Sequence, residues 1–146
     1  MNETSGESVG VSSLETSLAL DSDGTRIAQA RHLAAALLAH AREDHGIPVI
    51  AIAVENAQLI VSELVTNARK YAPGPALLHL RISDGVLQVE LWDSNPLAPV
   101  AKAPDPERVG QHGLEIVAAL AQSVLVEQTP LGKRIIANIV LGAASP

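Results

Sequence analysis

The sequence predicts an α+β fold in which a mixed, mostly antiparallel sheet carries helices on one face. Segments that alternate strictly between apolar and polar residues indicate half-buried strands, and longer segments with apolar residues at helical spacing indicate amphipathic helices. Because each strand of the predicted hairpin has one apolar and one polar face, one side of the sheet must meet water. The helices must cover the other side, which gives a two-layer α/β sandwich.

The first half of the chain predicts one strand and two helices. Residues 14–20 can form a short edge strand, and the turn at 21–24 offers an N-cap to a first helix that reaches about Glu43. Proline is tolerated where a helix starts, so Pro48 opens a second helix that covers about 52–72.

The second half predicts four strands and a third helix. Strands at 77–83 and 86–93 are joined by Asp84-Gly85, a two-residue hairpin signal. The Pro-rich connection over 94–109 is long for a domain of this size and is a candidate ligand-covering segment. The elements expected after it are a helix at 114–121 and strands at 124–127 and 135–141.

Length and composition indicate one domain with an aliphatic core. The chain has 146 residues, no Phe, one Tyr and one Trp. We expect a single domain over 14–142. The Ser-, Gly- and Glu-rich residues 1–13 are expected to form a disordered tail and not a signal peptide, and 143–146 a C-terminal tail.

Charge and cysteine content narrow the class of ligand. The absence of Cys excludes disulfides and thiolate metal sites, and five scattered His give little basis for a structural metal. The net charge of −6, with no basic cluster interleaved with aromatics, argues against direct nucleic-acid binding. No apolar run approaches the roughly 18 residues of a membrane span. We therefore expect a cytoplasmic protein with a protein partner or small ligand and no membrane contact.

Polar side chains recur along one edge of the predicted helix over 52–72. At about 100° per residue, Asn56, Glu63, Asn67 and Lys70 fall in one stripe beside the apolar face. A stripe at the rim of a core can meet a ligand while partly shielded from water. The same pattern is also typical of a solvated helix flank.

Asp93 continues the apolar series of its predicted strand, so its carboxylate points into the helix-covered side if the pleat holds. Burying an unpaired carboxylate costs at least several kcal/mol, and a partner or ligand is therefore expected. If the strand instead ends at Trp92, Asp93 begins a turn.

Glycines precede the predicted helix at 114–121, in the segment Gly110-Gln-His-Gly113-Leu114. Glycine lets backbone N–H groups approach an anion, and a helix N-terminus favours negative charge. A phosphate would fit there, although such a segment also serves as a plain loop hinge.

In this order, the three segments resemble the ATPase domain of the GHKL (Bergerat-fold) superfamily, which includes histidine kinases and gyrase. The resemblance covers about 14–141 and is closest to the small bacterial anti-sigma factor serine/threonine kinases and related ATP-binding regulators of actinomycetes. Residues 63–68 resemble the asparagine box, Asp93 the adenine-binding aspartate, and 110–114 the glycine box of the ATP lid. Gly132-Lys133 resembles the turn before the last strand, after which Arg134 stands where many relatives have Thr.

The resemblance implies ATP and Mg²⁺ as ligands and assigns roles to individual residues. Asn67 would hold Mg²⁺, and Glu63 would be the base that activates the attacking hydroxyl. Asp93 would accept a hydrogen bond from the adenine amino group. The other residues that the resemblance places in the nucleotide site are Lys70, Tyr71, Gly110, Gly113, Leu114 and Lys133.

The function implied by the resemblance is that of an ATP-dependent serine/threonine kinase of the anti-sigma type. Such a protein binds a sigma factor and phosphorylates an antagonist protein, as a monomer or a homodimer. Two alternatives stay open at this point. One is a module of the same fold that only holds partners, and the other is the isolated catalytic part of a two-component histidine kinase.

Overall fold

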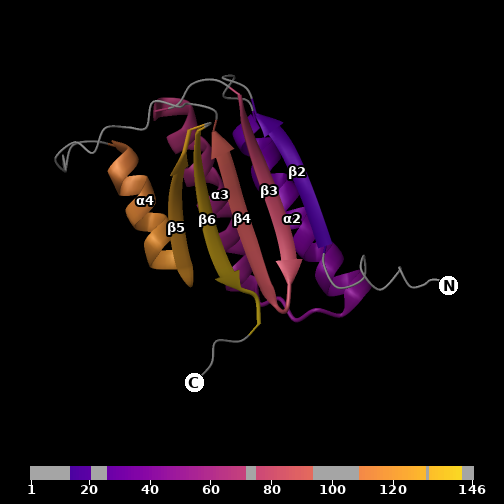
Figure 1. Cartoon of the computed structure of the whole chain (residues 1–146). Coiled ribbons are helices and arrows are strands. Elements are labelled where there is room, and N and C mark those ends of the chain that lie inside the picture. The colour runs from indigo at the N-terminus through magenta and orange to yellow at the C-terminus, as the bar shows by residue number, and fades with distance from the viewer. Residues whose placement is uncertain (1–13, 21–25, 72–74, 94–108, 131, 143–146) are drawn as a thin grey trace.

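The computed structural model describes residues 14–20, 26–71, 75–93, 109–130 and 132–142, with the side chains of 69–71 and 109–113 left out. Helices and strands alternate in groups along this part of the chain (Figure 1). The elements are β2 (Leu14–Leu20), α2 (Arg26–His45), α3 (Ala51–Tyr71), β3 (Ala76–Ser83), β4 (Val86–Asp93), α4 (Val109–Leu120), β5 (Ser123–Thr129) and β6 (Gly132–Val140).

The five described strands form one open sheet in the order β2-β3-β4-β6-β5. All four of its pairings are antiparallel, so the expected mixture with parallel pairs is not found among the described strands. The described helices α2, α3 and α4 lie together on one face of the sheet (Figure 1). The predicted two-layer α+β sandwich is thereby confirmed.

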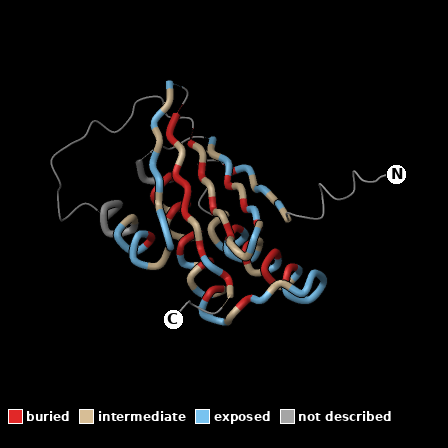
Figure 2. Tube along the Cα trace, turned by 60° about the horizontal axis from the view of Figure 1, so that its bottom comes forward, coloured by how far each residue is buried: buried red, intermediate tan, exposed pale blue. Residues whose placement is uncertain are grey.

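The core lies between the sheet and the helices, and it is aliphatic as expected. Buried and more exposed residues alternate along the strands (Figure 2). Leu80, Val89 and Ala137 are paired neighbours on β3, β4 and β6, and all three are fully buried. Helix α3 adds Ile60 and Leu64, which are also fully buried. The strands contribute the covered face of a pleated sheet and the helices contribute their apolar stripes.

Most predicted boundaries are correct to within about two residues, and the differences that matter most are in α4, β5 and β6. Helix α4 begins at Val109 and not at 114, so the glycines of 110–113 lie inside its first turns. Glycine costs about 1 kcal/mol in a helix relative to Ala, which weakens a helix without ending it. Strand β5 extends over Ser123–Thr129, and β6 begins at Gly132, three residues before the predicted start. Gly132-Lys133 therefore belongs to the strand.

Other predictions concern segments outside the described residues. These are the proposed tails at 1–13 and 143–146 and most of the Pro-rich connection, which is described only from 109 onward. Among the described helices, none combines the length and the apolar character needed to cross a membrane.

The β3–β4 hairpin turns on Asp84 and Gly85, whose φ angles are 54° and 76°. Positive φ at both central residues is the geometry that matches the twist of a two-residue hairpin. A Cβ added to Gly85 would meet no atom within 4 Å, so its conformation and not crowding selects glycine. The carbonyl of Gly85 also accepts a hydrogen bond from the N–H of Leu141, 3.0 Å away, which ties the turn to the end of β6.

This geometry predicts opposite tolerances at the two turn positions. Gly85→Ala should lower the free energy of unfolding by about 1 to 2 kcal/mol, because a side chain is disfavoured in the left-handed region. Asp84→Gly relieves the same constraint and should change it by less than about 0.5 kcal/mol. Urea unfolding measures both, and equal losses in the two variants would contradict this account of the turn.

Candidate functional site

The predicted site residues come from elements that meet at one end of the molecule. The last residues of α3 and β4 lie at the same end of the molecule as the first residues of α4 and β6 (Figure 1). Asn67 lies near the end of α3, Asp93 is the last residue of β4 and Lys133 is the second residue of β6. We call this part of the molecule, with Asn67, Asp93 and Lys133, the Asp93 end.

Asp93 is buried on the helix-covered face, as the alternation of its strand predicts. It is 5% exposed and pairs with Ala76 of β3 and Lys133 of β6. Strand β4 therefore continues through Asp93, and the alternative in which the strand ends at Trp92 is wrong.

Lys133 is one partner of the buried Asp93 carboxylate. Its backbone N–H donates to Asp93 Oδ1 at 3.3 Å, and its Nζ lies 3.8 Å from Asp93 Oδ2. The side chains are only 10% exposed for Lys133 and 3% for Asp93. Opposite charge at this distance offsets part of the cost of taking both groups out of water.

The structure places the two residues that follow Gly132 on opposite faces of the sheet. Arg134, which stands where many relatives have Thr, lies on the uncovered face, where it contacts Glu90 and Trp92. Lys133 is the residue that faces Asp93. The alternation along β6 contains this information, but its use requires the β4–β6 register, which pairs Asp93 with Lys133, 40 positions further along the chain.

Asn67 and Glu63 lie one turn apart on α3 and so share a helix face. Asn67 is 5% exposed, and Glu63 is half-buried. Among the described residues, none forms a hydrogen bond with the Asn67 side chain. A buried amide without a partner costs about 1 to 3 kcal/mol. Its oxygen is the type of ligand that Mg²⁺ prefers, so the residue fits the predicted metal role.

The remaining predicted residues divide into two groups. Lys70 and Tyr71 lie in the last turn of α3, which places their backbone at the Asp93 end. Gly110 and Gly113 belong to α4 itself, where they were expected to precede it. Leu114 is partly buried and packs against the hydrophobic core, so its side chain stabilises the fold.

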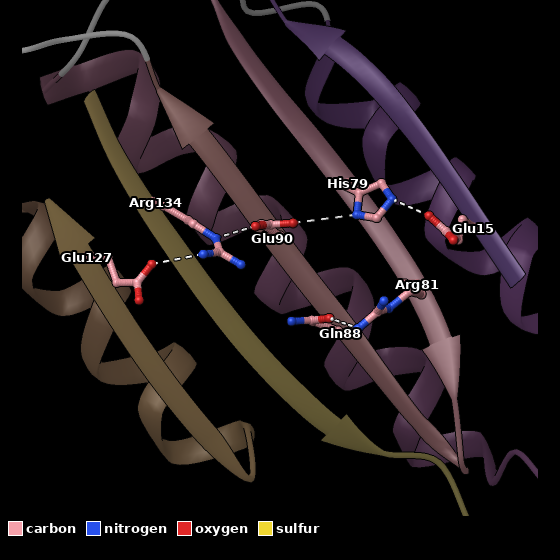
Figure 3. Close-up of polar contacts among 7 residues, drawn as sticks. All are labelled: Glu15, His79, Arg81, Gln88, Glu90, Glu127 and Arg134. Atoms are coloured by element: carbon pink, nitrogen blue, oxygen red, sulfur yellow. Dashed lines mark hydrogen bonds and ion pairs between the residues drawn. The ribbon is translucent and has the colours of Figure 1, made fainter. Parts of the chain in front are cut away.

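A second polar system, the open-face row, crosses the uncovered face of the sheet (Figure 3). His79 Nε2 lies 2.9 Å from Glu15 Oε1, and His79 Nδ1 lies 3.5 Å from Glu90 Oε1. Arg134 donates to Glu90 and, at 2.9 Å, to Glu127. One residue of this row comes from each strand: Glu15 from β2, His79 from β3, Glu90 from β4, Arg134 from β6 and Glu127 from β5.

Arg134 joins the open-face row to the aromatic residue beside it. Its guanidinium carbon lies 5.1 Å from the centre of the Trp92 ring, within the range of a cation–π interaction. The hydrogen bond to Glu90 raises the pKa of Arg134 above its usual value, although desolvation acts the other way. Sequence reasoning identified a wet face but missed the row, because the row depends on the register of all five strands.

A shallow, mainly apolar pocket of about 280 Å³ lies away from the Asp93 end. It is bordered by residues at the start of α3, the end of α4 and the end of β6, including Ile52, Leu120 and Val140. Asn56 of the predicted polar stripe lines it, but none of the residues assigned to the nucleotide site does. Within the described part of the chain, no three His, Asp or Glu side chains gather closely enough to hold a metal on their own.

The fold and the Asp93 end together define the class of protein. An antiparallel sheet covered by helices on one face, with a buried asparagine and a buried aspartate at one end, is the arrangement expected of the ATPase domain. The chain belongs to the histidine kinase-like ATPase domain family, whose family model matches residues 20–139.

A solved structure shows the same fold. It is the structure of the RsbU and RsbW domains of Rv1364c from Mycobacterium tuberculosis, with a TM-score of 0.64 and 17% sequence identity. The match covers 90% of this chain and 34% of that chain, so this chain spans about a third of the length of the matched protein. A search of curated proteins gave no significant match.

The open-face row predicts unequal effects for its two glutamates that contact Arg134. Glu90 is 12% exposed and contacts both Arg134 and His79, so Glu90→Gln should lower the free energy of unfolding by about 1 to 3 kcal/mol. Glu127 is 43% exposed, and Glu127→Gln should cost less than about 1 kcal/mol. Urea unfolding tests both variants. A larger loss for Glu127→Gln would show that the row is organised around β5 and not around β4.

Proposed function

We propose that this protein is an ATP-dependent serine/threonine kinase of the anti-sigma-factor type. In this proposal it binds a sigma factor and phosphorylates a Ser or Thr of an antagonist protein, in the cytoplasm. The observation that carries the proposal is the buried Asn67 amide, one turn after Glu63 and at the same end as Asp93. Family membership and the likeness to a protein with an RsbW domain support it.

The residues of the Asp93 end, together with Glu63 one turn before Asn67, are suited to phosphoryl transfer. Glu63 would accept the proton of the attacking hydroxyl as the new oxygen–phosphorus bond forms and the bond to the β-phosphate oxygen breaks, releasing ADP. Asn67 would hold Mg²⁺, which neutralises part of the phosphate charge when it is bound. Asp93 would accept a hydrogen bond from the adenine amino group. This reaction needs positioned charge more than new covalent chemistry.

A second candidate is a regulator of the same fold that holds partners without catalysis. The Asp93–Lys133 contact favours it, because a nucleotide must compete for a carboxylate that already has a cation beside it. Transfer of labelled phosphate from ATP to an antagonist protein separates this candidate from the kinase. Transfer to a histidine would instead support the isolated part of a two-component kinase.

ATP binding should depend on Asn67 and Asp93 for different reasons. Asn67→Ala should weaken binding chiefly in the presence of Mg²⁺, because it removes a metal ligand. Asp93→Asn should weaken the binding of adenosine with or without Mg²⁺, because the amide is a poorer acceptor than the carboxylate. Calorimetry measures both, with Asn56→Ala as a control on the same helix, where Asn56 borders the distant apolar pocket. Unchanged ATP affinity in both site variants would show that the site is wrongly assigned.

Glu63→Gln should separate binding from chemistry. A general base contributes about 10² to 10⁴ in rate, so the variant should keep its fold and its ATP affinity while losing most phosphorylation of the antagonist. Glu55→Gln is the matched control, because Glu55 is an exposed carboxylate two turns earlier on α3. A Glu63→Gln protein that phosphorylates at the wild-type rate would exclude Glu63 as the base.

A further inference from the structure

We propose that Lys133 limits ligand affinity at the Asp93 end, acting as an internal counter-ion that a nucleotide base must displace from Asp93. The proposal rests on the proposed function for the identity of the ligand. The inference goes beyond the proposed function because it gives Lys133 a role that opposes ligand binding. Lys133 stabilises the empty site.

The two contacts of Lys133 with Asp93 are separable. The backbone N–H holds Oδ1 at 3.3 Å and is present whatever the side chain at 133. The ammonium lies 3.8 Å from Oδ2, which is longer than the 2.7 to 3.2 Å typical of an N–H···O hydrogen bond. The side chain therefore contributes charge without an optimal hydrogen bond, and it can move away while Asp93 keeps its backbone donor.

Burial strengthens the attraction between the Lys133 ammonium and the Asp93 carboxylate. Both side chains are at most 10% exposed, so water screens their attraction less than it screens pairs at the surface. Their positions are directly opposite in the β4–β6 register, and both belong to the helix-covered face. The contact is thus built into the sheet and does not depend on a chance meeting of two flexible side chains.

The pair affects the empty and the occupied site differently. In the empty site, Lys133 offsets the cost of the buried carboxylate. An adenine base that donates an N–H to Asp93 offsets the same cost. It therefore gains less binding free energy when the Lys133 ammonium already lies beside Asp93. Removing the cation should destabilise the empty protein and increase what the ligand gains on binding.

Adenosine is the suitable probe because it carries no phosphate. Loss of a positive charge would weaken the binding of ATP through its phosphates and obscure an effect at the base. Lys133→Met removes the ammonium and keeps the length and apolar stem of the side chain. Arg81→Met is the charge-matched control, since Arg81 is exposed on the open face and contacts Gln88. Lys133→Arg keeps the cation.

Calorimetric titration should show that Lys133→Met binds adenosine about tenfold more tightly than wild type, the gain expected from one hydrogen bond to a charged group that no longer competes with a cation. Arg81→Met should bind like wild type, and Lys133→Arg, which keeps a cation beside Asp93, should show no gain in adenosine affinity. The double variant Asp93→Asn/Lys133→Met should bind adenosine no more tightly than Asp93→Asn alone. Without the Asp93 carboxylate, removing the ammonium frees no acceptor for the adenine base. If Lys133→Met fails to fold, Lys133→Gln gives the same comparison with a neutral polar side chain.

Failure of this inference is distinguishable from failure of the proposed function. Weaker or unchanged adenosine binding by Lys133→Met, with Mg·ATP bound by wild type and lost in Asn67→Ala, overturns the counter-ion role and leaves the nucleotide site standing. Adenosine binding by Lys133→Met alone supports the counter-ion role. If neither wild type nor Lys133→Met binds adenosine or Mg·ATP, both proposals are wrong.

Discussion

Side-chain alternation along β4 and β6 is the constraint on which both polar systems of this protein depend. The described helices cover one face of the sheet, so each residue of these strands is committed either to the core or to the uncovered face. Asp93 and Lys133 fall on the covered side, while Glu90 and Arg134 fall on the other. A slip of one residue would expose the apolar row of β4 and bury the face that carries Gln88 and Glu90, so the core itself fixes the register.

The two polar systems differ in what their surroundings require. The open-face row has three carboxylates around one arginine and one histidine, and partial exposure keeps the cost of its charges low. The Asp93–Lys133 pair lies between the sheet and the helices, where replacing both partners by apolar residues of similar size is often neutral or even stabilising. The pair is therefore poorly explained as a device for stability, which agrees with the role in ligand binding that we propose for it.

The sequence predicts features that depend on residues close together in the chain better than features that depend on residues far apart in it. The hairpin at Asp84-Gly85 and the burial of Asp93 follow from local pattern, because a period of two and a turn signal are contained in a few residues. The partnership with Lys133 requires two strands that are distant in sequence to be aligned, and no local pattern contains that alignment. Helix α4 starts before the predicted 114, because neighbouring residues sustain the helix through glycines that are typical of a helix boundary.

The buried polar residues of the described part of the chain gather at the Asp93 end. Elsewhere the core is aliphatic, but here it contains a buried amide without a described hydrogen-bond partner and a buried ion pair. The unpaired Asn67 amide lowers the stability of the ligand-free protein. A ligand that satisfies this amide binds only the folded chain, so it stabilises the fold by mass action as it binds. The aliphatic core keeps the protein folded although the Asn67 amide is unpaired. The free energy lost at this amide is regained when a ligand hydrogen-bonds with it, and this gain favours binding.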